Sequence, residues 1–411
     1  MGTSAFRALR RHSCHRLRRC AGPGQPTTTQ TRLALLVRHR AVSRRLFPTS
    51  SVRAGGHLCD VRIAQVSPLY EAVPPRLYGG TERVVAALSD ALVDLGHDVT
   101  LFATAESQTK GLLSAVRPQA LRLDNSQLKS ELAAHLCMLH EVRQQAKNFD
   151  VLHFHTDLIH FPVFEPLAAK CVTTLHGRLD VKDLEPAFRR WPNFGLVSIS
   201  EQQRLPLPNA NWISNVPHGL PPDHFRFNPS SGSYLAFLGR MSPEKGPEVA
   251  IRLALKAEMP LKMAAKVDAV DRTYFTEVVK PLLNHSLIEF VGEISEADKS
   301  KFLGEASALL FPIRWPEPFG LVMIEAMACG TPVIAFAAGS VQEVIQDGCT
   351  GFVVHSEEQA LAALRTVNNL RRAPIRAVFE QRFTARRMAR DYLDVYSAAL
   401  APQRRQLARV S

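Results

Sequence analysis

The sequence predicts an α/β protein with two parallel-sheet domains that face a central cleft. Two observations lead to this prediction. From Arg62 onward, short β-branched and apolar runs alternate with helical patterns, which is the signature of βαβ units around a parallel sheet. Near residues 209–232 the composition changes to a stretch rich in Pro, Asn, Gly and Ser, which predicts a linker, and then the alternation begins again. Each half is therefore expected to be Rossmann-like.

The first domain is expected over residues 61–215. An amphipathic helix follows its first strand over 81–97 and ends near Gly96, and a second helix covers much of 125–147. The strands are expected at 62–67, 98–103, 150–155, 172–176 and 195–200.

The second domain is expected over residues 216–382. Its first helix is predicted at 247–257, and a last helix at 383–400 is long enough to return to the first domain. The strands are expected at 234–240, 261–267, 288–292, 308–312, 332–336 and 351–354.

The net charge of +12 is concentrated in the first 59 residues. They hold twelve Arg and neither Lys, Asp nor Glu, so the rest of the chain carries 38 basic and 38 acidic residues. A neutral body lacks the basic surface expected of a nucleic-acid-binding protein, and no nucleic acid partner is predicted.

Residues 1–60 are expected to form a basic, disordered extension outside the fold. Their Arg-rich, acid-free composition is typical of an organelle transit peptide. The alternative is a start assigned too far upstream, because the body begins VRIAQVSPLYE and Val61 is a plausible GTG-encoded initiator. We favour the second interpretation. Mass spectrometry of the native N-terminus decides between them, since a peptide from residues 5–50 contradicts it.

The location of the protein is expected to be the cytoplasm. Its seven cysteines are scattered and odd in number, which fits a reducing compartment. There is no run of about 18 apolar residues that predicts a membrane span. Peripheral association with the inner membrane is the second option, although the stretch at 130–149 mixes acidic and basic residues and gives no strong membrane signal.

A pair of glycines, Gly79 and Gly80, opens the helix that follows the first strand. Glycine lets a backbone approach a phosphate closely, and a helix N-terminus offers unpaired N–H groups. The spacing is not GxGxxG and no acidic residue ends the second strand, which disfavours a nicotinamide dehydrogenase. A simple tight turn is the alternative for this pair.

The strand DVLHFH places His153 and His155 on one face because strand side chains alternate. His160 lies nearby, which raises the possibility of a metal site, but no Asp, Glu or Cys completes a familiar ligand spacing, so no metal is predicted. We expect His155 to face the cleft and contact substrate, and His153 to be buried.

Two cations flank the start of the helix at 247–257, namely Arg240 just after a strand and Lys245 just before Gly246-Pro247. Fixed cations beside a helix N-terminus are what a departing diphosphate requires, because they stabilise its developing charge. A solvated basic turn is the alternative.

The stretch EPFGLVMIEAMACGTPVIA begins at Glu317 and starts a further helix at Phe319-Gly320-Leu321. The helix N-terminus can bind a second face of the same diphosphate. Glu325, one turn after Leu321, can accept hydrogen bonds from the vicinal hydroxyls of a ribose, and Glu317 projects toward the sugar. The alternative for Glu325 is an internal ion pair, for example with an Arg, because buried carboxylates are seldom unpaired.

Together these motifs resemble the retaining GT-B glycosyltransferases of family 4, bacterial group 1 type, over residues 62–400. The resemblance implies the GT-B fold. It implies that Arg240 and Lys245 hold the donor diphosphate, that Glu325 binds the nucleotide ribose, and that Glu317 binds the transferred sugar. Gly80 lines the phosphate side, and His155 touches the sugar near the reacting carbon. The motifs, in chain order, are Gly79-Gly80, HFH, TLHG, SISE, NVPHGL, FLGRMSPEKG and the Glu-x7-Glu stretch.

The expected activity is transfer of a hexose from a nucleotide-diphosphate sugar to an unidentified carbohydrate, lipid or small-molecule hydroxyl acceptor, with retention of anomeric configuration. The chain has no Asp-x-Asp triplet, so neither a metal nor another cofactor is expected. Arg314 departs from the family pattern, where an acidic residue is more usual, and bears on donor specificity. The alternatives are a GT-B-like nucleotide-sugar epimerase, a phosphorylase with a pyridoxal phosphate lysine, and an inactive nucleotide-sugar-binding module.

Overall fold

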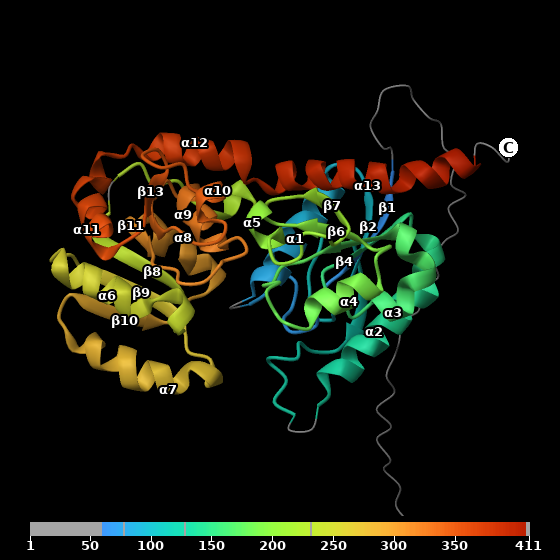
Figure 1. The fold of residues 1–411 in the computed structure, drawn as a ribbon, viewed down its shortest axis with the longest axis horizontal. Helices are drawn as coiled ribbons and strands as arrows, with labels where there is room; N and C mark the ends of the chain where they lie inside the picture. Colours follow the sequence, from blue (N-terminus) through green and yellow to red (C-terminus); the bar gives the residue numbers. More distant parts are fainter. Residues whose placement is uncertain (1–59, 77–78, 127–128, 231, 408–411) are drawn as a thin grey trace, which may run out of the picture. The chain divides into compact units, whose positions relative to one another are not determined.

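The computed structural model describes residues 60–76, 79–126, 129–230 and 232–407, which belong to one compact unit. The predictions for residues 1–59 lie outside this part of the chain. Two parallel sheets organise the unit (Figure 1).

The first sheet has seven strands in the order β3-β2-β1-β4-β5-β6-β7. Its central strands read as continuous apolar runs because helices cover both faces of the sheet, as parallel sheets require. The strands are β1 (Arg62–Val66), β2 (Asp98–Thr104), β3 (Leu112–Arg117), β4 (Val151–Phe154), β5 (Cys171–Thr174), β6 (Gly195–Ser198) and β7 (Trp212–Asn215).

The second sheet repeats this arrangement with six strands in the order β10-β9-β8-β11-β12-β13. In both sheets the first strand pairs with the second on one side and with the fourth on the other, so the strand order reverses there. Ligands of open parallel sheets bind at such switch points. The strands are β8 (Tyr234–Arg240), β9 (Leu261–Lys266), β10 (Ile288–Gly292), β11 (Ala306–Phe311), β12 (Val333–Phe336) and β13 (Gly351–Val354).

Helices connect the strands and cover the sheets. The longer ones among the described residues are α1 (Gly80–Asp94), α2 (Glu131–Gln145), α6 (Pro247–Lys256), α8 (Glu296–Gly304), α9 (Leu321–Ala328), α11 (Glu357–Thr366), α12 (Arg372–Arg382) and α13 (Ala385–Leu407). The short helices are α3 (Phe161–Phe164), α4 (Leu184–Arg190), α5 (Glu201–Arg204), α7 (Arg272–Tyr274) and α10 (Val341–Val344). Short 3-10 and π turns are η1 (Ala146–Asn148), η2 (Glu165–Lys170), η3 (Pro222–His224), η4 (Pro243–Lys245), η5 (Ala269–Asp271), η6 (Phe275–Val279), η7 (Lys280–Asn284) and η8 (Val367–Asn369).

The last helix, α13, returns to the first sheet as predicted and packs beside α1 (Figure 1). Its Tyr392 and Tyr396 are fully buried there, in one apolar cluster with strand residues such as Val151. Burial of two large aromatic side chains stabilises this return, because each removes a large apolar area from water.

Two edge strands were missing from the sequence prediction. β3 lies where no element was expected, and β7 lies inside the stretch at 209–232 that was interpreted as a linker. Both are only half-buried, so they lack the continuous apolar run that marks the central strands. The helix expected over 125–147 is shorter, since α2 begins after Ser130, whose side chain accepts a hydrogen bond from the N–H of Ala133.

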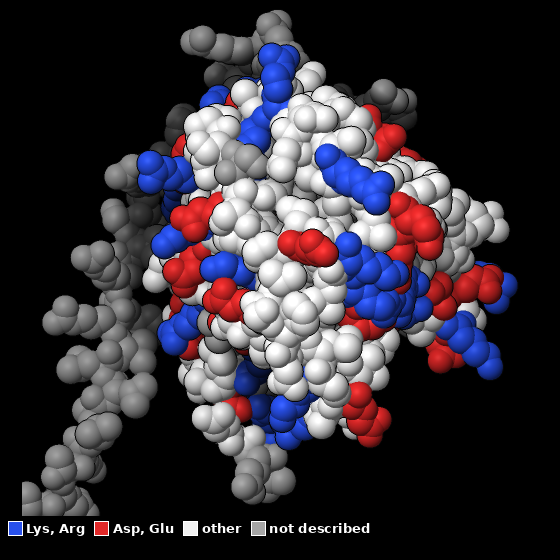
Figure 2. All heavy atoms as spheres, turned by 90° about the vertical axis from the view of Figure 1, so that its left-hand side faces the viewer, with Lys and Arg blue, Asp and Glu red and all other residues white. Residues whose placement is uncertain are grey.

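Basic and acidic side chains lie interspersed on the face of the second-sheet half that is turned to the viewer in Figure 2. On this face the charge pattern agrees with the neutral body computed from the sequence. No helix of the described ranges is both long and apolar enough to cross a membrane.

Candidate active site

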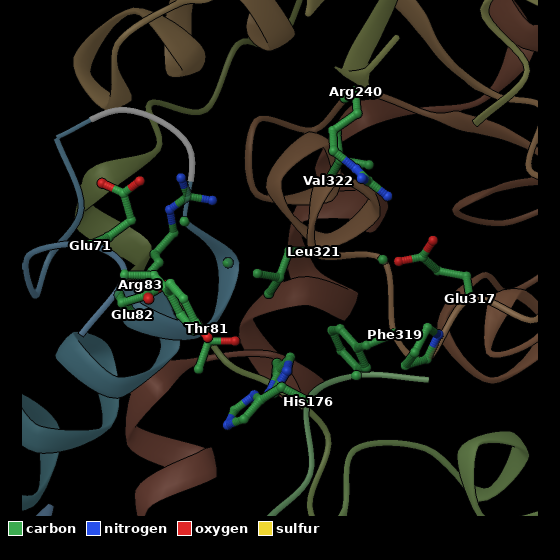
Figure 3. Close-up of a pocket in the computed structure, with 18 of the residues that line it drawn as sticks. Glu71, Thr81, Glu82, Arg83, His176, Arg240, Glu317, Phe319, Leu321 and Val322 are labelled. Atoms are coloured by element: carbon green, nitrogen blue, oxygen red, sulfur yellow. The ribbon is translucent and has the colours of Figure 1, made fainter. Parts of the chain in front are cut away.

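A pocket of about 980 Å³ lies at the carboxyl ends of strands from both sheets. Much of its wall comes from the segments after β1 and β4 and after β8 and β11, the two switch points. Figure 3 shows Arg240 and Glu317 on one side, Glu71 and Arg83 on the other, and Leu321 between them. Ten residues were assigned to the site from the sequence, and all of them line this one pocket: Gly79, Gly80, His155, Arg240, Lys245, Glu317, Phe319, Gly320, Leu321 and Glu325.

The two predicted cations are held at the end of β8 and the start of α6. Arg240 is the last residue of β8, and its guanidinium lies 3.4 Å from Glu244 and 3.7 Å from Asp268. Lys245 precedes Gly246, which has φ 63° and leaves only 2.4 Å between an added Cβ and the carbonyl oxygen of Pro312. Glycine is therefore required at 246, and this turn positions Lys245.

Lys245 forms an ion pair with Glu317 across the pocket wall. The indole N–H of Trp315 donates to the same carboxylate oxygen, Oε2, at 2.8 Å. The ammonium group also lies 5.4 Å from the Trp315 ring centroid, within cation–π range. Both polar contacts use Oε2, and in the described part of the chain Oε1 of Glu317 has no polar partner.

The starts of α1 and α9 meet at the pocket. A Cβ added to Gly80 would lie 3.4 Å from Cδ1 of Leu321, the first residue of α9. Two helix N-termini that face one space favour an anion there. Gly79 also has a packing reason, because an added Cβ would lie 2.7 Å from Pro75.

Glu325 does have the internal partners that its burial requires. It is 2% exposed, and its Oε1 accepts from Arg83 at 2.7 Å and from Lys299 at 3.5 Å. Burial alone would raise the pKa of Glu325, but Lys299 and Arg83 outweigh it and hold that pKa below its ordinary value. The internal pairing considered as an alternative is thus present. Both contacts are on Oε1, and Oε2 has no polar partner among the residues that the structure describes.

Arg83 and Lys299, the two partners of Glu325, belong to a larger charged group that joins α1, α8 and α9. Arg83 also contacts Glu296 at 2.6 Å, and Lys299 contacts Glu296 at 3.0 Å. Arg83 and Lys299 were missed from the sequence. The one available signal was the position of Arg83 in the first turn of a helix whose N-terminus was already a candidate.

The histidine predictions divide. His153 is buried as expected, with its ring nitrogens 2.8 Å from the Tyr396 hydroxyl and 2.7 Å from the Thr174 hydroxyl. His155 lines the pocket, but both of its ring nitrogens are bonded within the protein, to His176 at 2.8 Å and to Gln65 at 2.8 Å. Neither ring nitrogen of His155 is open to a substrate in this arrangement, and its contact with a substrate stays a prediction.

His176 presents the open nitrogen instead. It lines the pocket, and its buried Nδ1 has no hydrogen-bond partner among the described residues. Burial lowers the pKa of His176 to about 3, so the ring is neutral at physiological pH. The sequence TLHG contained this residue, and its place at the end of the strand expected at 172–176 was the signal that could have assigned it to the pocket.

Arg314 lies outside the pocket lining. Its guanidinium is 2.5 Å from Glu248 of α6 and nearly half exposed. Arg314, which departs from the family pattern, therefore makes no direct contribution to the lining of this pocket. Within the described ranges, no group of three or more His, Cys, Asp or Glu side chains is placed to hold a metal ion.

The first-sheet side of the pocket carries three carboxylates that were not predicted, Glu71, Glu82 and Asp157. Each stands in a loop or helix start after a β-strand, but none belongs to a motif. Glu71 is paired with Arg122.

Two family models match the chain. "Glycosyltransferase Family 4" covers residues 78–207, and "Glycosyl transferases group 1" covers residues 223–380. The matches fall on the two halves whose switch points form the pocket. The chain belongs to the group 1 glycosyltransferases. Its fold is the GT-B fold, as predicted, and the glycosyltransferase resemblance is confirmed.

Known proteins resemble this glycosyltransferase along most of its length. A phosphatidyl-myo-inositol mannosyltransferase of Mycolicibacterium smegmatis is 26% identical over 361 residues, covering 79% of the chain and 89% of the relative. A glycosyltransferase involved in avilamycin A biosynthesis has the same fold, with a TM-score of 0.65, 24% identity, and 83% and 98% of the two chains covered. The Anabaena protein HepE, solved with UDP-glucose, gives a TM-score of 0.62 at 18% identity over 82% and 100% of the two chains.

Proposed function

We propose that this glycosyltransferase moves a hexose from a nucleotide-diphosphate sugar to a hydroxyl acceptor, with retention of anomeric configuration and without a required metal ion. The observation that carries the proposal is the convergence of Arg240, Lys245 and the start of α9 on one pocket. Cations and helix N-termini aimed at one place stabilise the charge of a departing diphosphate.

The donor contacts follow from the open atoms. The diphosphate lies between the starts of α1 and α9, and Lys245 keeps two ammonium protons for it beyond the contact with Glu317. Oε2 of Glu325 accepts from the ribose hydroxyls, and Oε1 of Glu317 from the transferred sugar. The structure of HepE with UDP-glucose supports a nucleotide-sugar ligand for this fold.

The histidines act in sequence. His155 is a positioning residue that holds His176 through the 2.8 Å contact between Nδ1 and Nε2. His176 then offers Nδ1 to a hydroxyl of the transferred sugar, and the departing phosphate oxygen takes the acceptor proton on the same face.

The proposed location of the protein is the cytoplasm, because its scattered cysteines fit a reducing compartment.

Two measurements test this proposal on the purified full chain. Nucleotide sugars are first screened for thermal stabilisation, because a ligand that binds only the folded state raises the unfolding temperature. With the donor found, proton NMR of the product is expected to show the anomeric configuration of the donor. Activity is expected to survive a chelator. Inversion contradicts retention, and loss in chelator with full recovery on adding Mg²⁺ contradicts metal independence.

A further inference from the structure

The pocket has a second polar region, on the first-sheet side, that the proposed donor contacts leave unused. It lies where the segment after β4 faces the first turn of α1, at the switch point of the first sheet. Three of its side chains are Glu82, Thr156 and Asp157. Figure 3 shows Glu82 on the side of the pocket opposite Arg240.

Two of these side chains are buried, and within the described ranges one lacks a hydrogen-bond partner and the other lacks an ion pair. Thr156 is 7% exposed, and its hydroxyl has no hydrogen-bond partner within the described ranges. Glu82 is 5% exposed, and its carboxylate has no ion pair among the described residues; its own backbone N–H is its contact. A buried polar group without a partner costs about 1–3 kcal/mol, so the Thr156 hydroxyl favours a ligand that supplies a hydrogen bond. Among the described residues, the Glu82 carboxylate has no ion-paired counter-ion that would compete with such a ligand.

Asp157 adds a second uncommitted carboxylate next to Thr156. It is exposed to the pocket, has no ion pair in the described part of the chain, and adopts φ 49°. Burial and the neighbouring carboxylates of Glu131, Asp157 and Glu82 raise the pKa of Tyr70. Tyr70 lines the same pocket as the two carboxylates.

The cations on this side are already engaged. Arg83 contacts Glu296 and Glu325, and Arg122 contacts Glu71 and lies 3.8 Å from Glu293. An acceptor phosphate here would lie beside the carboxylates of Glu71, Glu82 and Asp157, which repel it. Sugar and polyol hydroxyls meet no such repulsion, because carboxylates accept from them directly.

We infer that this region is the acceptor subsite and that it takes an uncharged sugar or polyol, held by Glu82, Thr156 and Asp157. The inference rests on the proposed function. The M. smegmatis relative is named for phosphatidyl-myo-inositol, which carries a phosphate diester. The inferred acceptor of this chain therefore differs from phosphatidyl-myo-inositol in carrying no charge.

The test uses acceptor pairs that differ only in a phosphate: myo-inositol and its 3-phosphate, glucose and its 6-phosphate, mannose and its 6-phosphate. The full chain is given its donor, and nucleotide release is measured with and without each acceptor. At least one neutral member is expected to raise release tenfold or more, and its phosphorylated partner less than a tenth as much. Phosphorylated members that work as well, or neutral members that all fail, overturn the inference.

Two variants locate the subsite. The first is Asp157→Asn, because Asn tolerates the same positive φ, and the second is Glu82→Gln. Each variant alone is expected to raise the KM for the neutral acceptor about tenfold while the KM for the donor stays unchanged. Asp183→Asn, on an exposed residue that does not line the pocket, is the matched control. An unchanged acceptor KM in both subsite variants overturns the assignment of these residues.

Acceptor-free nucleotide release separates the two proposals. If the chain binds and slowly hydrolyses a nucleotide sugar but prefers phosphorylated acceptors, the acceptor inference fails and the proposed function stands. If no nucleotide sugar binds and none is hydrolysed, the proposed function fails and the acceptor inference falls with it.

Discussion

Arg83 of α1 donates from Nη1 to Oε1 of Glu325 in α9 at 2.7 Å. This contact joins a helix that follows a strand of the first sheet to a helix that follows a strand of the second sheet. Glu325 is 2% exposed, so the pair is screened very little by solvent. Desolvation of a carboxylate costs several kcal/mol, which a cation at this distance offsets. The pair therefore stabilises the pocket wall where the ribose is proposed to bind.

Replacing Arg83 by Met is expected to destabilise the protein by about 2–4 kcal/mol at pH 7.5, because Glu325 keeps only the longer Lys299 contact. The loss shrinks below pH 5, since the carboxylate can then be protonated instead of paired. Urea unfolding at both pH values measures it. Arg189→Met, at a 72% exposed ion pair in α4, is the control and should cost little. Equal losses in the two variants contradict the role of Arg83.

Replacing Lys245 by Ala is expected to lower turnover about 10²-fold or more, the scale of losing one charged transition-state contact. Glu317 keeps the Trp315 N–H, so the fold should survive the change. The full chain is assayed by release of the nucleotide. Lys256→Ala removes a lysine from a solvent-exposed ion pair with Glu357 and should leave turnover unchanged. Near-normal turnover in the Lys245 variant would show that the diphosphate is held elsewhere.

The sequence predicted the central strands and the membership of the pocket because both depend on local patterns. Buried parallel strands are apolar throughout, and residues that follow such strands gather at one edge of a sheet. Arg240, Lys245, Glu317 and Glu325 could be assigned to one site in this way, without knowledge of any contact between them.

The partners inside the site could not be predicted, because they depend on packing between distant segments. Arg83 lies 242 residues from Glu325 along the chain, and neither residue carries a local mark of the other. His155 and His176 likewise meet only because β4 and β5 are neighbours in the sheet. The half-buried edge strand β7 was not predicted for a different reason, because its four residues lie in a Pro- and Asn-rich stretch.

Replacing Tyr396 by Phe is expected to lower turnover as well as stability. Its hydroxyl lies 2.8 Å from His153 and accepts from Gln65 at 3.2 Å, and Gln65 in turn holds His155. Loss of this hydroxyl leaves buried groups unpaired, at a cost of about 1–3 kcal/mol, and loosens the histidines of the pocket.

A matched variant separates the two effects of the Tyr396 change. Tyr234→Phe removes a buried hydroxyl that donates to the carbonyl of Phe302 at 2.7 Å, away from the histidines. Both variants should unfold at lower urea concentration, but only Tyr396→Phe should reduce kcat. Equal kcat in the two variants means that α13 supports the fold without positioning His155.

Replacing Glu82 by Gln is expected to stabilise the protein above neutral pH. Burial raises the pKa of Glu82 to about 7, against 4.5 for an ordinary Glu, although its own backbone N–H and Arg83 act in the opposite direction. Below pH 4.5 the carboxyl is protonated in both the folded and the unfolded chain, so it contributes no difference. Between pH 4.5 and 7 the unfolded chain loses its proton first, and stability falls by about 3 kcal/mol as pH rises. Gln cannot ionise, so the variant gains this amount at pH 8 and almost none at pH 4.5, as measured by urea unfolding.

The control for this prediction is Glu185→Gln, which makes the same chemical change on an exposed face of α4 and should show no such pH dependence. A Glu82→Gln protein that is no more stable than the parent at pH 8 would mean that the carboxylate has a partner when the pocket is empty, and it would weaken the case for an acceptor there.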